Sequence, residues 1–193
     1  MKIVLISSSI RIQRNSHRVA LLLQQKINGT GKFESNIIDL KEESIPLFQE
    51  RYIDMADPPP NLKAISEELK SADGIIFITP EYNGSISAAL KSLIDIYGSA
   101  EFADKPIGVA AVSTGALGGI RAALSLQQII LGINAYPFPR MLLTGEVTKQ
   151  VDEMGKIVIP GIEVKIEGFL TPFLGFVEKL KKIDQFIYEE FKT

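Results

Sequence analysis

Short apolar runs rich in β-branched residues alternate with longer amphipathic stretches along this chain of 193 residues. The alternation is typical of an α/β fold, because each crossover between parallel strands needs a helix-length connection. Five apolar runs predict strands at 3–6, 37–40, 74–78, 107–112 and 135–143. Apolar spacings of three and four predict helices at 16–27, 62–71, 87–97, 119–130 and 171–191.

No shift in composition marks a domain boundary, so residues 1–193 are expected to form a single domain. Three prolines at 58–60 suit the start of the second helix, where a missing N–H costs little. The stretch 145–168 is rich in glycine and charge, and we expect a short hairpin or an excursion there.

The composition excludes several chemistries. The chain has no Cys and one histidine, His17, so thiolate nucleophiles, disulfides, zinc fingers and His-rich metal sites are not expected. The net charge of −2 gives no reason to expect a nucleic-acid partner. No apolar run reaches the ~18–20 residues of a membrane span, and the N-terminus lacks a signal-peptide pattern, so a cytoplasmic location is expected.

Polar loops follow three of the predicted strands, and ligands bind beyond the carboxyl ends of strands in open parallel sheets. The first loop runs through Ser9 and Arg11 to Asn15 and Ser16, at the start of a predicted helix. Hydroxyls, a guanidinium and free helix N–H groups suit a phosphate monoester. Alternatively, Asn15 or Ser16 serves only as a helix cap.

The second loop, TPEYNGSI, starts at Thr79. An extended proline followed by polar residues offers backbone groups to a flat heterocycle, and Tyr82 and Asn83 add aromatic packing and amide hydrogen bonds. The alternative is a polar turn capped by Ser85. The third loop starts at Ser113 and holds Gly115, Gly118 and Gly119, which allow close approach of a ligand or positive φ angles.

At these residues the sequence resembles the NADPH-dependent FMN reductase family. The most specific match is TPEYNGSISAAL followed by KSLID, over 79–95, which is similar to the family's T-P-E-Y-N-x-S motif. The loop 113–119 resembles the family's S-x-G-x-x-G-G pattern. In the first loop Ser8 stands where the family usually has glycine, and the distance from Arg11 to Ser16 is longer than in the family.

The resemblance implies a flavodoxin-like three-layer sandwich with a five-stranded parallel sheet in the order 2-1-3-4-5, and non-covalent FMN at its carboxyl edge. The implied phosphate ligands are Ser9, Arg11 and Ser16, and Arg18 would reach either the phosphate or the nicotinamide donor. Pro80, Glu81, Tyr82 and Asn83 would line the isoalloxazine ring, with Ser113 and Gly115 on its other side.

The function implied is that of an FMN-dependent oxidoreductase. NADPH or NADH supplies the hydride, and a quinone, azo compound, metal oxyanion or free flavin takes the electrons, so no catalytic side chain and no metal is required. The alternative is a flavodoxin-type electron carrier, against which the S-S-S-I-R loop and the small net charge argue. A flavin-free nucleotide or regulatory domain is a third interpretation.

A homodimer or a dimer of dimers is also implied by the resemblance. Ala88, Leu93, Ile94 and Tyr97 supply an apolar helix face for such a contact, although the same spacing would serve a core within one chain. His17 is expected to be a surface or packing residue rather than a proton donor.

Overall fold

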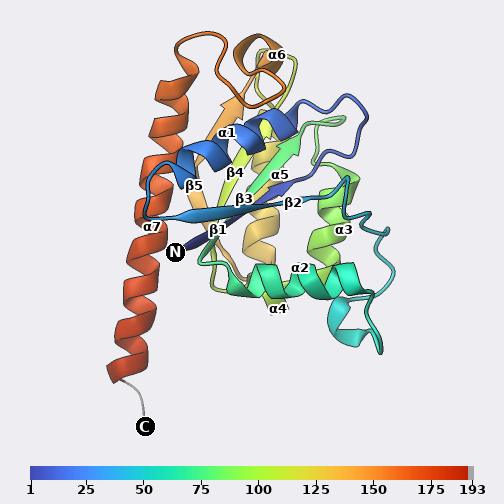
Figure 1. The fold of residues 1–193 in the computed structure, drawn as a ribbon. Coiled ribbons are helices and arrows are strands. Elements are labelled where there is room, and N and C mark those ends of the chain that lie inside the picture. Colours follow the sequence, from blue (N-terminus) through green and yellow to red (C-terminus); the bar gives the residue numbers. More distant parts are fainter. Residues whose placement is uncertain (191–193) are drawn as a thin grey trace.

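The computed structural model describes residues 1–190 and contains one parallel sheet of five strands in the order β2-β1-β3-β4-β5 (Figure 1). The strands are β1 (Lys2–Ser7), β2 (Glu34–Asp39), β3 (Gly74–Pro80), β4 (Pro106–Val112) and β5 (Tyr136–Thr144). All neighbouring strands are parallel. The predicted flavodoxin-like sheet and its strand order are confirmed.

Helices cover both faces of the sheet and give three layers (Figure 1). One face carries α1 (Ser16–Asn28) and α7 (Ile162–Glu190), and the other carries α2 (Pro60–Ser71), α3 (Ala88–Tyr97) and α5 (Ile120–Gly132). Short helices are η1 (Tyr52–Asp54), α4 (Ser99–Phe102) and α6 (Val147–Gln150). Pro60 occupies the first turn of α2, as its fixed φ favours.

Strand β2 begins three residues earlier than its apolar run. Glu34 and Asn36 are exposed while Ser35 and Ile38 are buried, because β2 lies at the edge of the sheet. An edge strand needs few apolar residues, so the apolar run in the sequence predicted only the last part of β2.

Helix α7 begins at Ile162, well before the predicted start at 171, and continues past Pro172. A proline inside a helix leaves the carbonyl four residues earlier without its helical donor. Here that carbonyl, of Gly168, accepts a hydrogen bond of 3.2 Å from Nη1 of Arg140 on β5. A contact from a distant strand therefore permits the helix to pass the proline. The predicted end at Phe191 lies outside the described residues.

The stretch 145–161 is an excursion that packs on α1. It contains α6 and an antiparallel bridge between Val151 and Ile157. Gly155 has φ +76°, and a Cβ there would lie 2.7 Å from Cβ of Leu21 on α1. The excursion expected over 145–168 is therefore confirmed for 145–161, whereas 162–168 belong to α7, and the close approach explains why glycine is needed at 155.

The apolar face proposed for a dimer contact belongs to the core of one chain. Leu93, Ile94 and Tyr97 of α3 are at most 3% exposed and pack in the cluster beneath α2 and α5. The assignment of these residues to a subunit contact is therefore wrong, and only Ala88 is exposed. Across residues 1–190, no helix combines the length and apolar character that a membrane crossing requires.

Candidate functional site

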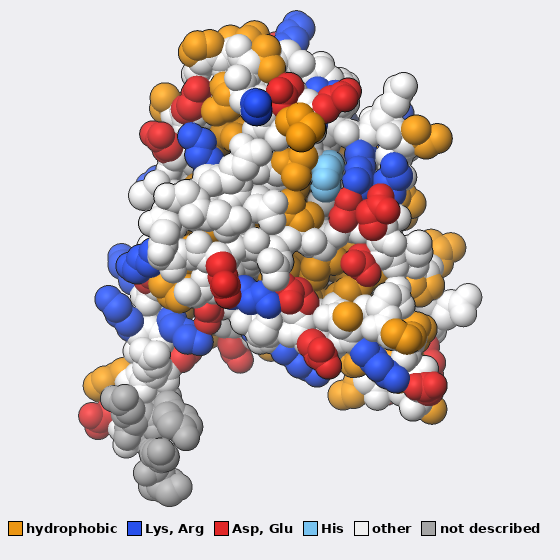
Figure 2. Space-filling model, viewed as in Figure 1, with side chains coloured by type: hydrophobic (Ala, Val, Ile, Leu, Met, Phe, Trp, Pro, Cys, Tyr) orange, Lys and Arg blue, Asp and Glu red, His pale blue; other side chains and the backbone are white. Residues whose placement is uncertain are grey.

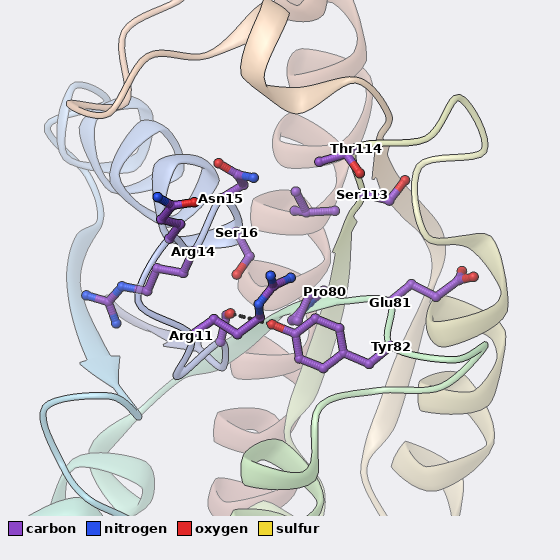
Figure 3. A pocket seen from close by; sticks show the side chains of 12 residues that line it. Arg11, Arg14, Asn15, Ser16, Pro80, Glu81, Tyr82, Ser113 and Thr114 are labelled. Atoms are coloured by element: carbon purple, nitrogen blue, oxygen red, sulfur yellow. Dashed lines mark hydrogen bonds between the residues drawn. The ribbon is translucent and has the colours of Figure 1, made fainter.

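The carboxyl ends of β1, β3 and β4 lie side by side, which brings their three loops together. Ser7 aligns with Ile78, and Pro80 aligns with Val112. A pocket of about 120 Å³ lies between the loops (Figure 3). Of the predicted ligands, seven line it: Ser9, Arg11, Ser16, Pro80, Glu81, Tyr82 and Ser113.

The first loop supplies a buried hydroxyl without a partner. Ser16 opens α1 and is 1% exposed, and its Oγ has no hydrogen-bond partner among residues 1–190. Asn15 is the N-cap residue, but its side chain makes no capping hydrogen bond in α1. The helix-cap interpretation is therefore wrong for Ser16, which lies inside the helix, and holds for Asn15 only by position. A buried unpaired hydroxyl is costly, so this one is available to a ligand in the pocket.

The second loop is joined to the first by its tyrosine. The hydroxyl of Tyr82 lies 2.7 Å from Oγ of Ser9, which is 1% exposed. The Arg11 guanidinium lies over the Tyr82 ring at 5.9 Å from its centroid, and Figure 3 shows the two side chains close together. A cation over an aromatic face is favourable, so the tyrosine helps to hold both residues of the first loop.

A tight turn follows Tyr82. The backbone N–H groups of Tyr82 and Ser85 each donate to the carbonyl of the other, at 2.9 and 3.1 Å. The two residues between them, Asn83 and Gly84, both have positive φ, +52° and +81°. This is the conformation that Asn-Gly favours in a two-residue turn. Asn83 is exposed and does not line the pocket.

The serine that caps the helix after this turn is not the one expected from the sequence. The cap of α3 is Ser87, not Ser85, since Ser87 Oγ accepts from the Leu90 N–H at 3.2 Å. The same hydroxyl donates to the carbonyl oxygen of Ser8 at 2.9 Å and lies 3.1 Å from Ser8 Oγ. Ser8, which stands where the family usually has glycine, is thus part of a buried link between the first loop and α3.

Figure 3 shows the Glu81 side chain pointing away from the other labelled side chains, and its carboxylate is bonded by Arg121 of α5. Its Oε1 accepts from Nε of Arg121 at 2.8 Å, and its Oε2 accepts from the Arg121 backbone N–H at 3.1 Å. Burial alone would raise the pKa of Glu81, but these contacts outweigh it and hold the pKa below its ordinary value. The ion pair anchors the second loop to the start of α5.

The three glycines of the third loop differ in backbone conformation and in the space around them. Gly118 and Gly119 have φ of +64° and +85°, and a Cβ on either would lie within 3.0 Å of a neighbouring atom. The positive φ angles expected of this loop therefore occur at these two glycines. Gly115 does not have positive φ, and its added Cβ would meet nothing closer than Ser113 Oγ at 3.8 Å. Ser113 Oγ donates to the Gly115 carbonyl at 2.8 Å.

A second, larger hollow of about 700 Å³ adjoins the first, and the two share five lining residues: Arg11, Gln13, Arg14, Asn15 and Thr114. Arg18 lines only this outer hollow, and donates to the Val151 carbonyl at 3.1 Å and to Glu153 at 3.3 Å. The excursion 145–161 thus forms part of the wall. Sequence reasoning missed Gln13 and Arg14, which line both hollows, and also Thr148 and Glu153, whose distance in sequence from α1 gives no signal.

His17 lies beside the site rather than in the inner pocket. Its Nδ1 is 3.0 Å from Ser7 Oγ and 3.5 Å from Oδ2 of Asp39. Burial, aided by Arg14, lowers the pKa of His17 below 6.5 in spite of Asp39, so the imidazole is neutral at neutral pH. A neutral packing residue agrees with the expectation from sequence.

Comparisons with known proteins agree with this geometry. The family model for NADPH-dependent FMN reductase matches residues 1–149. An NADPH azoreductase of Bacillus sp. (strain OY1-2) is 29% identical over 184 residues, covering 94% of this chain and 97% of the relative. A quinone reductase of Escherichia coli (strain K12) is 30% identical over 142 residues, 71% of this chain and 76% of the relative. The structure of a flavoenzyme NAD(P)H:(acceptor) oxidoreductase from Paracoccus denitrificans shares the fold, with TM-score 0.78 at 21% identity over 92% of this chain and 97% of that one. The chain therefore belongs to the NADPH-dependent FMN reductase family.

Proposed function

We propose that this protein is an FMN-dependent oxidoreductase that takes a hydride from NADPH or NADH and passes the electrons to a small acceptor. The observation that carries the proposal is the buried, unpartnered hydroxyl of Ser16 at the start of α1, in a pocket also lined by Arg11 and by Pro80, Glu81 and Tyr82. The family match supports FMN as the cofactor.

The inner pocket has the donors that a phosphate monoester needs. Ser16 brings a hydroxyl, Arg11 brings a guanidinium, and the start of α1 brings free N–H groups and the positive end of the helix dipole. Ser9 adds a second buried hydroxyl. We assign the phosphate to Ser9, Arg11 and Ser16. Arg18, on the outer hollow, is assigned to the nicotinamide donor or to the outer side of the phosphate.

The second and third loops would hold the flavin ring between them. Pro80 and the backbone of Glu81 lie on one side of the pocket, and Ser113 lies on the other. Tyr82 closes the side toward the first loop. We place Asn83 and Gly115 at the rim, with Asn83 supporting the turn and Gly115 leaving room for a ring edge.

FMN, when bound, supplies the redox chemistry, since a flavin accepts a hydride and releases electrons singly or in pairs. The chain's residues have only to bind it, orient it and leave one face open, and we assign no catalytic side chain. The relatives named azoreductase and quinone reductase support azo compounds or quinones as acceptors. We propose that residues 1–193 form one FMN-binding domain.

An anaerobic reduction experiment tests this function. The protein is loaded with FMN, freed of excess and mixed with NADPH or NADH without oxygen, and the visible flavin absorbance is followed. We expect rapid bleaching by at least one donor, and return of the absorbance when a quinone or azo dye is added. A protein that binds FMN but is bleached by neither donor would instead be an electron carrier of the flavodoxin type.

We also propose a homodimer in the cytoplasm. Leu124 and Leu131 of α5 are 52% and 62% exposed and lie seven residues apart, on the same face of the helix. An exposed apolar stripe of this kind supports a contact between two copies of the chain. Sedimentation of the FMN-loaded protein and of a Leu124→Glu variant tests the contact, and a wild-type monomer at micromolar concentration would exclude it. Cell fractionation tests the location.

A further inference from the structure

The loop between β1 and α1 carries much of the inner pocket, yet it is weakly attached to the rest of the protein. No backbone hydrogen bond within the described residues joins residues 9–14 to any other part of the chain. Ile12 at the loop's tip is 91% exposed. Its conformation therefore depends on side-chain contacts at each end of the loop.

One end of the loop is held by Ser9 and the other by Arg14. Ser9 bonds to Tyr82, as described above. Arg14 makes two hydrogen bonds to the carboxylate of Asp39, one to each oxygen. It is the one ion pair that residues 9–14 form in the part of the chain covered by the structure. Both side chains are mostly buried, at 13% and 14% exposed, which reduces the screening of the pair by water.

Asp39 is itself rigidly placed. It ends β2, and its backbone carbonyl accepts from the N–H groups of Glu42 and Glu43 at 3.0 Å. The adjacent Leu40 N–H donates to the Ser7 carbonyl at 3.0 Å, so the end of β2 is fixed to the end of β1. Figure 2 shows the single histidine of the chain at the surface, beside basic and acidic side chains. Arg14 is the cation whose side chain donates to both oxygens of the Asp39 carboxylate.

We infer that Asp39 is a positioning residue for cofactor binding: through Arg14 it holds the loop in the conformation that presents Ser9, Arg11 and Ser16 to the FMN phosphate. Asp39 does not line the inner pocket. The inference rests on the proposed binding of FMN. Pre-ordering a loop raises affinity because the ligand no longer has to order it.

Whether removal of the Asp39 charge weakens or strengthens FMN binding distinguishes a positioning role from simple electrostatics. Removing a negative charge near a phosphate site strengthens binding if Coulomb attraction alone decides. It would also release Arg14, which lines the pocket and would then be able to reach the phosphate. If Asp39 positions the loop, the same change weakens binding, because the loop loses its anchor.

The experiment measures the FMN dissociation constant by quenching of flavin fluorescence in Asp39→Asn, Arg14→Gln and the double variant. We expect each single change to weaken binding about tenfold, and the double variant to be no weaker than either, because all three break the same contact. The control is Glu68→Gln, which breaks the partly buried pair with Lys2 and is expected to leave the constant unchanged. Equal or tighter binding by Asp39→Asn would overturn the inference.

A second readout needs no FMN. Trypsin cleavage after Arg11 in the apoprotein, followed by mass spectrometry, reports how often the loop leaves its folded conformation. We expect faster cleavage in Asp39→Asn and in Arg14→Gln than in the wild type and in Glu68→Gln; an unchanged rate would contradict the anchoring. Because this assay works without the cofactor, a wild-type protein that fails to bind FMN would disprove the proposed function while the anchoring remains measurable.

Discussion

Replacing Ser16 by alanine should have opposite effects on the free and the FMN-loaded protein. In the free protein the Ser16 hydroxyl is buried without a partner, and an unpaired buried hydroxyl costs about 1–3 kcal/mol. Ser16→Ala removes that cost, so the free energy of unfolding should stay the same or rise. In the loaded protein the variant loses a hydrogen bond to a charged phosphate, worth about 1.5–3 kcal/mol, which is roughly 10- to 150-fold in the dissociation constant.

Ser66→Ala is the matched control, because Ser66 is equally buried but its hydroxyl is used. It donates to Oε1 of Glu101 at 2.8 Å, and Glu101 is 2% exposed. This variant should lose about 1–3 kcal/mol of stability and bind FMN normally. Urea unfolding of the apoprotein and a fluorescence titration with FMN measure both quantities. The reasoning is refuted if Ser16→Ala destabilises the apoprotein as Ser66→Ala does and binds FMN as the wild type does.

Three further predictions concern the other loops and the titratable groups. Gly119→Ala should lower the melting temperature, because φ is +85° and the added Cβ would lie 3.0 Å from its nearest neighbour. Gly115→Ala should leave the melting temperature unchanged but weaken FMN binding. Equal melting temperatures of the two variants would contradict this assignment. Burial lowers the pKa of His17 in the folded state, so stability should fall as the pH drops below 6.5, and His17→Asn should remove that slope in urea unfolding at pH 7 and pH 5. Arg121→Ala should cost about 1 kcal/mol or less at pH 7, because Arg121 is largely exposed. That difference should shrink as the pH falls below 4.5, because the pKa of Glu81 is lowered in the folded state, and it should vanish once the pH lies below that lowered pKa; a cost that does not fall with pH would exclude the ion pair as its source.

The inner strands β3 and β4 could be predicted from sequence because both of their faces are buried. All seven residues of β3 and all seven of β4 are buried, so they read as continuous apolar runs. The first part of β2 and the first turns of α7 were not predicted from the sequence, for different reasons. An edge strand exposes alternate residues. The carbonyl of Gly168, which Pro172 leaves without a helical donor, is bonded by Arg140 of β5, a partner that the local sequence does not indicate.

The three loops of the site were predictable from their place after three adjacent strands, but the use of each side chain was not. Ser16, Ser85 and Ser87 all precede or open helices, and only the fold shows that Ser87 caps one while Ser16 has no partner. The link from Arg14 to Asp39 joins the loop after β1 to the end of β2, and the two residues lie 25 residues apart in sequence. Spacing within one loop carries no information about such a partner.

The most direct test of the central claim, an FMN site at the carboxyl edge of this sheet, is a titration of the purified apoprotein with FMN. We expect saturable binding of one FMN per chain, with the absorbance spectrum of an oxidised, protein-bound flavin, and weaker binding in Ser16→Ala. A folded wild-type protein that binds no FMN, or that binds it equally well without the Ser16 hydroxyl, would contradict the account.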